Sequence, residues 1–480
     1  MRLSYKLSKE TFIYGIGILI TRSIILFLIP VYTRIFTPGE YGRIELLTQI
    51  GLLVGEFINL GMDSAQSLYF NKVKDDGIKA QARIISSILQ LRLIWGSFFL
   101  CIVLLCSVFI NSILFNSELS SAYFVVLFFG IFLNQITYQC AEIFRLRYLP
   151  INYVLFTSLS ILLGIPFILF FALKIKLGIF GFLLGTTIGH LITTIYAISK
   201  IKSYIIFEKI YSYLWPKVLR FGLPLSLSAI IFYLMNTADR YFIEIYNGDY
   251  ELGLYSAAAK LSLIITGFVT PFRYAWWPRA MSLIYQKNGY KLISEISKIY
   301  LGISFTIMIL LTLFSQLIIK SFTTFEYYEA WKLIGILMWP IVCYGFSTIC
   351  SVGIWKSEKT LYGTTSNFIA VILGILLNYL MVPKYGSVGA AIATSLTFTF
   401  WIVLITYFSK KLENIKLPYL ILFSQAFTAI VSIYIIIIND PSKKPFVCFI
   451  TFVLSSFIFL ILGFNDRIST KFINSAQNNN

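Results

Sequence analysis

The chain has 480 residues, of which 58% are hydrophobic and 12% charged, and its mean hydropathy is +0.81. Soluble globular domains carry about 25% charged residues and roughly 45 to 50% apolar ones, so this composition leaves too little polar surface for a water-soluble fold. At about 20 residues for each transmembrane helix, fourteen helices would take roughly 280 residues, which approaches the apolar share of the chain. A soluble enzyme with a single membrane anchor is excluded.

The charge of the chain is strongly positive, with 39 lysines and arginines against 21 aspartates and glutamates. A nucleic-acid-binding domain would gather such charge on one face or arm. Here the basic residues are spread through short connectors between apolar runs, where they indicate membrane orientation. The six cysteines lie inside apolar segments without a CxxC pair, and only His190 could join them. We therefore expect neither a disulfide framework nor a metal site.

The first apolar run spans residues 11–32 and follows Arg2, Lys6 and Lys9. This charged start resembles that of a secretory signal peptide. The run is longer than the roughly 7 to 15 apolar residues of such a peptide, and no cleavage site with small residues follows it. We expect the run to be retained as the first transmembrane helix.

Apolar windows bounded by proline, glycine and charge predict about fourteen transmembrane helices, and therefore an all-α polytopic membrane protein. A polar hairpin separates the seventh and eighth windows. The windows are residues 11–32, 44–62, 84–110, 122–143, 153–173, 177–198, 218–238, 253–272, 300–319, 331–354, 361–382, 388–408, 417–438 and 446–463.

The connectors between these windows predict the orientation of the chain. With both termini in the cytoplasm, the inner segments hold 26 lysines and arginines and the outer segments hold 9. The other four basic residues lie inside or at the edge of the windows. Because cytoplasmic loops are enriched in lysine and arginine, this bias predicts that both termini are cytoplasmic.

A connector at residues 199–217 divides the windows into six before it and eight after it. Its lysines and aromatic residues recur at helix-like intervals, which is typical of a helix lying in the headgroup layer. Six helices return the chain to the side where it began, so two such bundles would share one orientation. The predicted parts are an N-terminal bundle over 1–198, an interfacial cytoplasmic linker over 199–217, a C-terminal bundle over 218–409, two additional helices over 410–464 and a cytoplasmic tail over 465–480.

The first and seventh windows end in similar hairpins. Arg34 follows the first and Arg240 follows the end of the seventh, and a short polar hairpin with a glycine, Gly42 or Gly253, leads into the next helix in each case. This order favours an internal duplication, although any outer hairpin could hold an arginine and a glycine.

Several motifs resemble one family of transporters. They are Pro30, Thr33-Arg34, Pro38 and Tyr41-Gly42 in the first hairpin, and Asp239-Arg240 with Gly253-Leu-Tyr-Ser-Ala-Ala in the second. With the length and the loop pattern, they resemble the polysaccharide exporters of the multidrug/oligosaccharidyl-lipid/polysaccharide (MOP) superfamily, in particular the Wzx-type O-antigen flippases.

This resemblance implies two MATE-like six-helix bundles around a central cavity, with two extra helices at the C-terminal end. It implies transfer of an undecaprenyl-diphosphate-linked oligosaccharide from the inner to the outer leaflet of the bacterial inner membrane. It also implies that the protein works beside a glycosyltransferase and a polysaccharide polymerase.

Basic residues inside the windows are the candidates for binding the anionic diphosphate, because intramembrane charges are costly and usually face a polar cavity. Arg22 lies about halfway along the first window and is poorly placed to reach water at either end. Arg92 in the third window and Lys260 in the eighth complete the predicted substrate-binding set. Arg22 could instead pair with an acid such as Glu56 or Glu142, and Arg92 could extend toward the cytoplasm.

Acidic residues support a competing function, the export of organic cations coupled to a proton or sodium gradient. Such an exporter needs a buried carboxylate, and Glu56 is the candidate. Asp239 and Arg240 predict a gate at the outer hairpin, or else simple caps of helix ends. Gly222 and Pro224 near the inner end of the seventh window predict a hinge, or an ordinary packing kink.

Enzyme signatures are absent from the sequence. No Walker A motif occurs, and His190 alone cannot complete a nucleophile, base and acid set. The loops are too short for a glycosyltransferase domain. We therefore expect a transporter without a resident cofactor or metal, and an ion gradient is the one energy source that the acidic residues suggest.

Cysteine labelling tests the predicted topology. We expect Asn247→Cys to react with a membrane-impermeant thiol reagent in intact cells, because the hairpin is predicted to lie outside. Lys202→Cys should react only after the membrane is opened. The unchanged chain, with its six native cysteines, is the control. Labelling of Asn247→Cys only from the cytoplasmic side would refute the model.

Overall fold

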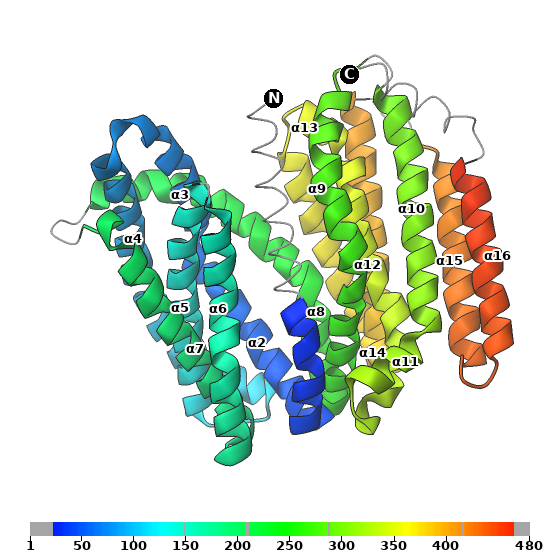
Figure 1. Cartoon of the computed structure of the whole chain (residues 1–480), viewed down its shortest axis with the longest axis horizontal. Helices are drawn as coiled ribbons and strands as arrows, with labels where there is room; N and C mark the ends of the chain where they lie inside the picture. The colour runs from blue at the N-terminus through cyan, green and yellow to red at the C-terminus, as the bar shows by residue number, and fades with distance from the viewer. Residues whose placement is uncertain (1–22, 148, 207–210, 287–288, 414–416, 465–480) are drawn as a thin grey trace. The chain divides into compact units, whose positions relative to one another are not determined.

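The computed structural model is built from helices (Figure 1). The residues that the structure describes are 23–147, 149–206, 211–286, 289–413 and 417–464. Within these ranges every regular element is a helix. The chain divides into two compact units, Met1–Gly253 and Leu254–Asn480. The bundle boundaries at residues 198, 217 and 409 stay predictions.

The N-terminal unit is a bundle in which α5 is central. α5 packs against α2, α4, α6 and α7, and α3 packs against α4 and α5. The helices of this unit are Ser23–Ile35, α2 (Pro38–Asn59), α3 (Met62–Lys72), α4 (Ile78–Leu114), α5 (Ser121–Leu146), α6 (Pro150–Leu169), α7 (Gly178–Ile201) and the part of α8 (Trp215–Ser262) that precedes Leu254.

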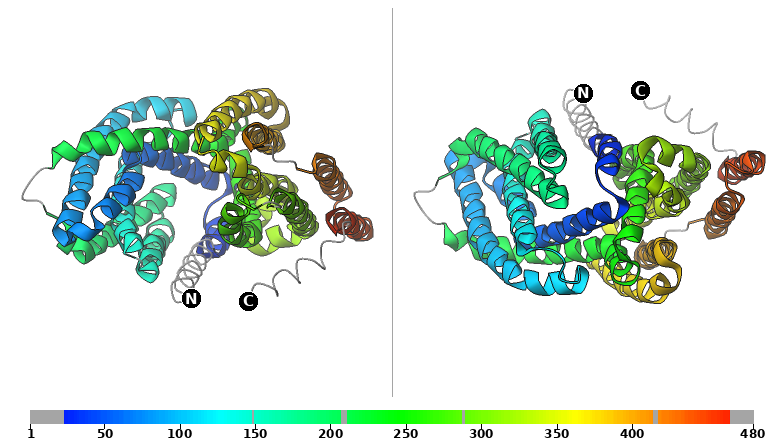
Figure 2. Two further views of the ribbon diagram at one scale, coloured as in Figure 1. Left: turned by 90° about the horizontal axis from the view of Figure 1, so that it is seen from above. Right: turned by 90° about the horizontal axis from the view of Figure 1, so that it is seen from below.

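Small residues allow α6 and α7 to lie side by side, as both views of Figure 2 show. A Cβ atom at Gly189 of α7 would lie 2.6 Å from the carbonyl oxygen of Ser160, and one at Gly185 would lie 2.4 Å from the nitrogen of Ile168. Helices in a membrane associate mainly through such close packing, since lipid tails are as apolar as leucine side chains.

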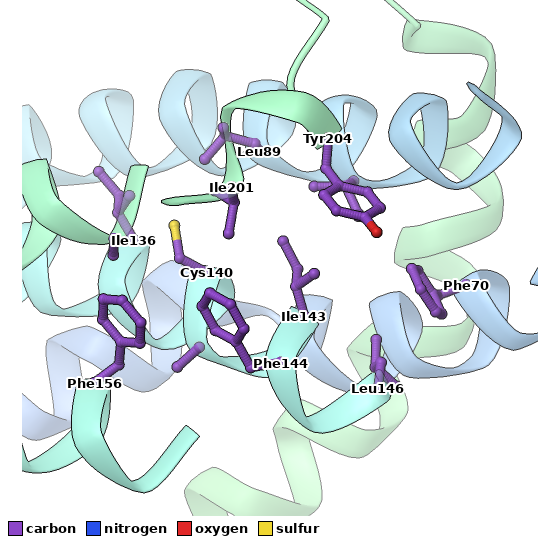
Figure 3. Packing of buried hydrophobic residues seen from close by; sticks show 13 residues of the cluster. Phe70, Leu89, Ile136, Cys140, Ile143, Phe144, Leu146, Phe156, Ile201 and Tyr204 are labelled. Atoms are coloured by element: carbon purple, nitrogen blue, oxygen red, sulfur yellow. The ribbon is translucent and has the colours of Figure 1, made fainter. Parts of the chain in front are cut away.

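An apolar core of buried side chains holds helices of this unit together (Figure 3). Its buried side chains come from α3, α4, α5, α6 and α7, and the rings of Phe144 and Phe156 stack with centroids 5.0 Å apart. The residues labelled in the figure are Phe70, Leu89, Ile136, Cys140, Ile143, Phe144, Leu146, Phe156, Ile201 and Tyr204.

The segment that follows α7 lies along α4. Its described parts form two short 3-10 turns, Lys202–Tyr204 and Ser212–Leu214, and not the continuous helix that its spacing suggested. Ser87 of α4 donates a hydrogen bond to the carbonyl of Tyr211 at 3.0 Å, and Gln90 accepts one from the backbone N–H of Tyr211 at 3.1 Å. Side chains of α4 thus satisfy backbone groups that a helix would have paired internally.

The C-terminal unit is organised around α10, which packs against α9, α12, α15 and α16. Gln425 of α15, which is fully buried, donates to the carbonyl of Lys298 on α10 at 3.2 Å. The helices of this unit are the end of α8, α9 (Thr266–Leu283), α10 (Gly289–Leu313), α11 (Ser315–Phe322), α12 (Trp331–Cys350), α13 (Val352–Lys356), α14 (Leu361–Glu413), α15 (Tyr419–Asn439) and α16 (Pro445–Phe464).

Eleven helical stretches among the described residues are long and apolar enough to cross a membrane. Two of them, of 72 and 53 residues, contain a glycine with non-helical backbone, Gly248 and Gly386, so each bends into a pair of predicted spans. Ser23–Ile35 is a shorter apolar helix that overlaps the end of the first predicted window. The all-α architecture of about fourteen transmembrane helices is confirmed.

Candidate functional site

α2 carries many of the polar side chains inside the N-terminal unit. It begins with a capping box, in which the Thr37 side chain accepts from the backbone N–H of Glu40 and the Glu40 carboxylate accepts from that of Thr37 at 3.0 Å. The cap fixes where the helix starts. Glu45, Gln49 and Glu56 then fall four and seven residues apart, which places them on one face.

A polar cluster joins α2 to α8, here termed the α2–α8 cluster: Glu45, Gln49, Tyr233, Asp239 and Arg240. Both carboxylates are almost fully buried, and the Arg240 guanidinium lies 3.6 Å from Glu45 and 3.2 Å from Asp239. Gln49 donates to Glu45 at 2.8 Å, and the Tyr233 hydroxyl donates to the Gln49 carbonyl at 2.6 Å. Two buried acids therefore share one guanidinium.

The hairpin inside α8, around Gly248, packs closely on the start of α2. A Cβ atom at Gly42 would lie 2.2 Å from the carbonyl oxygen of Asp249, and one at Gly253 would lie 1.8 Å from the carbonyl oxygen of the first residue of α2. This approach brings Arg43 into ion pairs with both Asp249 and Glu118. Gly42 and Gly253, the glycines of the two similar hairpins, thus both lie where α2 and α8 approach each other.

Arg92, one of the predicted substrate contacts, is fully buried and neutralised by its neighbours. Its guanidinium lies 2.6 Å from the Asp63 carboxylate and donates to the Asn59 side chain at 3.1 Å. It also donates to the backbone carbonyl of Gln135. This arrangement is that of a paired charge inside the bundle.

Arg92 bridges a break in the second predicted span. Leu60 and Gly61 separate α2 from α3 with φ of 45° and 72°, which are left-handed conformations. The guanidinium binds Asn59 on one side of the break and Asp63 on the other. A Cβ atom at Gly61 would lie 2.2 Å from the carbonyl oxygen of Gly222 on α8, so the predicted hinge residue lies directly against the break.

Two other predicted acids are placed differently. Glu56 is half-buried on α2, close enough to interact electrostatically with Asp63 and Arg92. Glu142 binds Arg145 on its own helix, with both carboxylate oxygens 2.8 Å from the guanidinium Nε. Glu56, Asp63 and Arg92 therefore lie near one another at the break in the second span.

Lys260 is half-buried near the end of α8, in the C-terminal unit. Ser256, one turn earlier, is fully buried, whereas Gly267 is exposed, and a Cβ atom added there would have no neighbour within 4 Å. A 3-10 turn, η5 (Leu263–Ile265), separates Lys260 from Gly267. Ser256, Lys260 and Gly267 therefore do not form one straight stripe of small and polar residues along a helix face.

Arg273 lies one residue beyond the predicted window 253–272, within the apolar helical stretch Ser212–Leu283. It lies within α9, and its guanidinium carbon is 3.8 Å from the ring centroid of Tyr344 on α12. Its Nε is buried without a hydrogen-bond partner, and no carboxylate of the described residues pairs with it. Phe272, Tyr274 and Trp276 lie close to it in the chain, and α9 continues past residue 272 to Leu283.

The other predicted residues fall outside these clusters. Arg22 lies outside the described residues. His190 is half-buried on α7, and Lys332 at the start of α12 pairs with Glu329. Within the ranges that the structure describes, no three His, Cys, Asp or Glu side chains are grouped as metal ligands would be.

A family model for polysaccharide biosynthesis proteins matches residues 7–284, which is more than half of the chain. The chain therefore belongs to the polysaccharide biosynthesis protein family. A second family model, MatE, matches residues 224–380. No curated protein matches the sequence.

Solved structures show the same fold. The chain is similar to a lipid II flippase, MurJ, in an inward closed conformation, with a TM-score of 0.72 and 15% identity over 94% of this chain and 98% of that one. It is also similar to an inward-facing multidrug resistance MATE transporter, with a TM-score of 0.63 and 15% identity over 82% and 97%. The resemblance to the MOP superfamily is confirmed.

Exchanges at Arg92 and Asp63 test whether this pair is structural. We expect Asp63→Ala to lower the melting temperature more than Arg92→Met, because it leaves a fully buried guanidinium without its carboxylate, while Asp63 is partly exposed. Breaking a buried pair costs about 3 to 5 kcal/mol. The double variant Arg92→Met with Asp63→Leu should recover part of the loss in thermal unfolding.

The matched control is Lys332→Met, which removes a largely exposed ion pair with Glu329 and should cost less than about 1 kcal/mol. A substrate contact would behave otherwise. If Arg92→Met is as stable as the unchanged protein but fails to transport, Arg92 serves the substrate and not the bundle.

Proposed function

We propose that this protein moves undecaprenyl-diphosphate-linked oligosaccharide units from the inner to the outer leaflet of the bacterial inner membrane, for O-antigen or another surface polysaccharide. Family membership supports a role in polysaccharide synthesis. The likeness to a lipid II flippase supports a fold suited to lipid-linked sugars. On this proposal the protein is a transporter with both termini cytoplasmic, and a glycosyltransferase and a polymerase act before and after it.

The observation that supports an anionic substrate is that Arg273 has no acidic partner among the described residues. A basic side chain within a span is costly unless it has a partner, and Arg273 pairs with no carboxylate among the described residues. Two unit charges about 4 Å apart attract by about 4 kcal/mol at an effective dielectric near 20. The Tyr344 ring contacts the Arg273 guanidinium, and a diphosphate would accept hydrogen bonds from the guanidinium N–H groups.

Lys260 and Arg22 remain the other proposed contacts of the diphosphate. Arg92 is a weaker candidate, because its guanidinium already binds Asp63, Asn59 and Gln135. We therefore propose a substrate-binding set of Arg22, Lys260 and Arg273.

Export of organic cations is the second candidate, favoured by one observation. At the break in the second span, Glu56 and Asp63 provide two carboxylates for the one guanidinium of Arg92. One carboxylate is therefore left to bind a proton or sodium ion. The MatE match supports this candidate. The same carboxylate would also suit an ion-coupled flippase.

A deletion strain tests the function and separates the candidates. A flippase predicts that lipid-linked repeat units accumulate in the inner leaflet, whereas a cation exporter predicts altered sensitivity to cationic dyes. In complementation, Arg273→Ala should lower surface polysaccharide at least about tenfold, and Arg273→Lys should retain part of it because charge is kept while the fork is lost. Lys332→Ala, which removes a basic residue at a helix start, is the control.

The result that would overturn this assignment is specific. Full polysaccharide export by Arg273→Ala, with protein present in normal amounts, would exclude Arg273 from substrate binding. Unchanged lipid-linked intermediates in the deletion strain would exclude the flippase itself.

The α2–α8 cluster is the proposed gate. Asp239→Asn removes one of the two acids that share Arg240, so we expect transport to fall several-fold while the protein level stays normal. Glu251→Gln changes an acid of the same hairpin that makes no described ion pair, and should transport normally. Complementation measures both, and unimpaired export by Asp239→Asn would remove the gate.

A further inference from the structure

A cavity of about 340 Å³ lies beside α11 in the C-terminal unit, away from the residues assigned to transport. It is lined by Lys320, the last basic residue of α11, and by the segment that follows it. That segment includes the start of the 3-10 helix η6 (Phe325–Ala330). The lining residues are Lys320, Thr323, Thr324, Phe325 and Tyr328.

Lys320 is the charged group of this cavity. Its ammonium lies 5.0 Å from the ring centroid of Tyr328, and no carboxylate of the described residues pairs with it. Four other lysines of this unit have carboxylate partners, whereas others, such as Lys384 and Lys411, have none among the described residues. The four pairs are Lys298 with Glu295, Lys332 with Glu329, Lys356 with Glu413 and Lys443 with Asp440.

The helix next to the cavity has one apolar face without protein cover. Leu317 of α11 is 62% exposed and Phe325 is 89% exposed, while Ile319 on the other face is fully buried. The buried face is fixed in place, because Gln316 donates to the Asp440 carboxylate at the turn between α15 and α16. A short helix with this division is suited to the boundary between headgroups and acyl chains.

We propose that this cavity binds the headgroup of an anionic diacyl phospholipid. The Lys320 ammonium binds the phosphate, which supplies the counter-charge that the cavity lacks. The acyl chains lie along Leu317 and Phe314, whose exposed surfaces face lipid. The rings of Phe325 and Tyr328 stack 6.5 Å apart at the level of the headgroup, where aromatic side chains are favoured.

A soluble phosphate fits these observations less well. It would satisfy Lys320 but leave the adjoining apolar face of α11 unused. The lipid satisfies both, because it joins an anionic headgroup to hydrocarbon, and Lys320 and the exposed Leu317 lie three residues apart on one helix. The inference concerns binding and holds whatever substrate the protein transports.

Native mass spectrometry of the purified full-length chain tests this site. The protein is placed in phosphatidylcholine nanodiscs with increasing phosphatidylglycerol, and retained phosphatidylglycerol is counted. Lys320→Gln should lower the apparent affinity of one phosphatidylglycerol by about tenfold. Lys320→Arg should retain it. Lys332→Gln, a nearby lysine outside the cavity, should behave as the unchanged protein.

Two results would overturn the proposal. Equal phosphatidylglycerol retention by Lys320→Gln and the unchanged protein, at equal melting temperature, would exclude the site. Displacement of the lipid by soluble glycerol phosphate at the same concentration would show that the acyl chains contribute nothing and that the site takes a free phosphate.

Discussion

A charge placed among apolar helices must be neutralised close to where it lies, because the bilayer core offers no water to solvate it. This constraint organises the polar interior of the N-terminal unit. Arg92 binds Asp63, and Arg240 lies between Glu45 and Asp239. In each case the arginine and an acid come from different helices, so neutralising the charge also fixes how the helices pack.

The same constraint governs the backbone. The second span is broken at Leu60 and Gly61, and a break in a span frees polar groups that must find partners. Asn59 meets part of this need, because its side-chain oxygen accepts from the backbone N–H of Asp63 at 3.3 Å as well as from Arg92. Gly222 of α8 packs against the break without a side chain. A polar, bent position in a span is where transporters place their moving parts. The predicted hinge residue Gly222 lies at this break, whereas the proposed gate is the α2–α8 cluster.

Arg273 departs from this pattern. Its guanidinium contacts an aromatic ring and no carboxylate within the described part of the chain. Under the proposed function, an arginine in this state is available to a lipid-linked diphosphate. Lys320 is another basic residue without a carboxylate partner among the described residues, and the phospholipid proposed above would supply its counter-charge.

The sequence by itself determined the fold class and the approximate spans, because burial in lipid imposes a long apolar run on every helix. Gly42 and Gly253 could be marked as parts of a motif, yet only the structure shows that both lie where α2 and α8 approach closely. Arg92 shows the limit most clearly. Hydropathy reports that a charge lies inside a span, but whether that charge is paired depends on Asp63 and Gln135, which are 29 and 43 residues away in the chain. α9 continues past the predicted window end at residue 272, so only the structure shows that Arg273 lies on this helix without an acidic partner among the described residues. Whether two residues on different helices form a pair depends on their distance in the folded structure. The sequence alone does not give that distance.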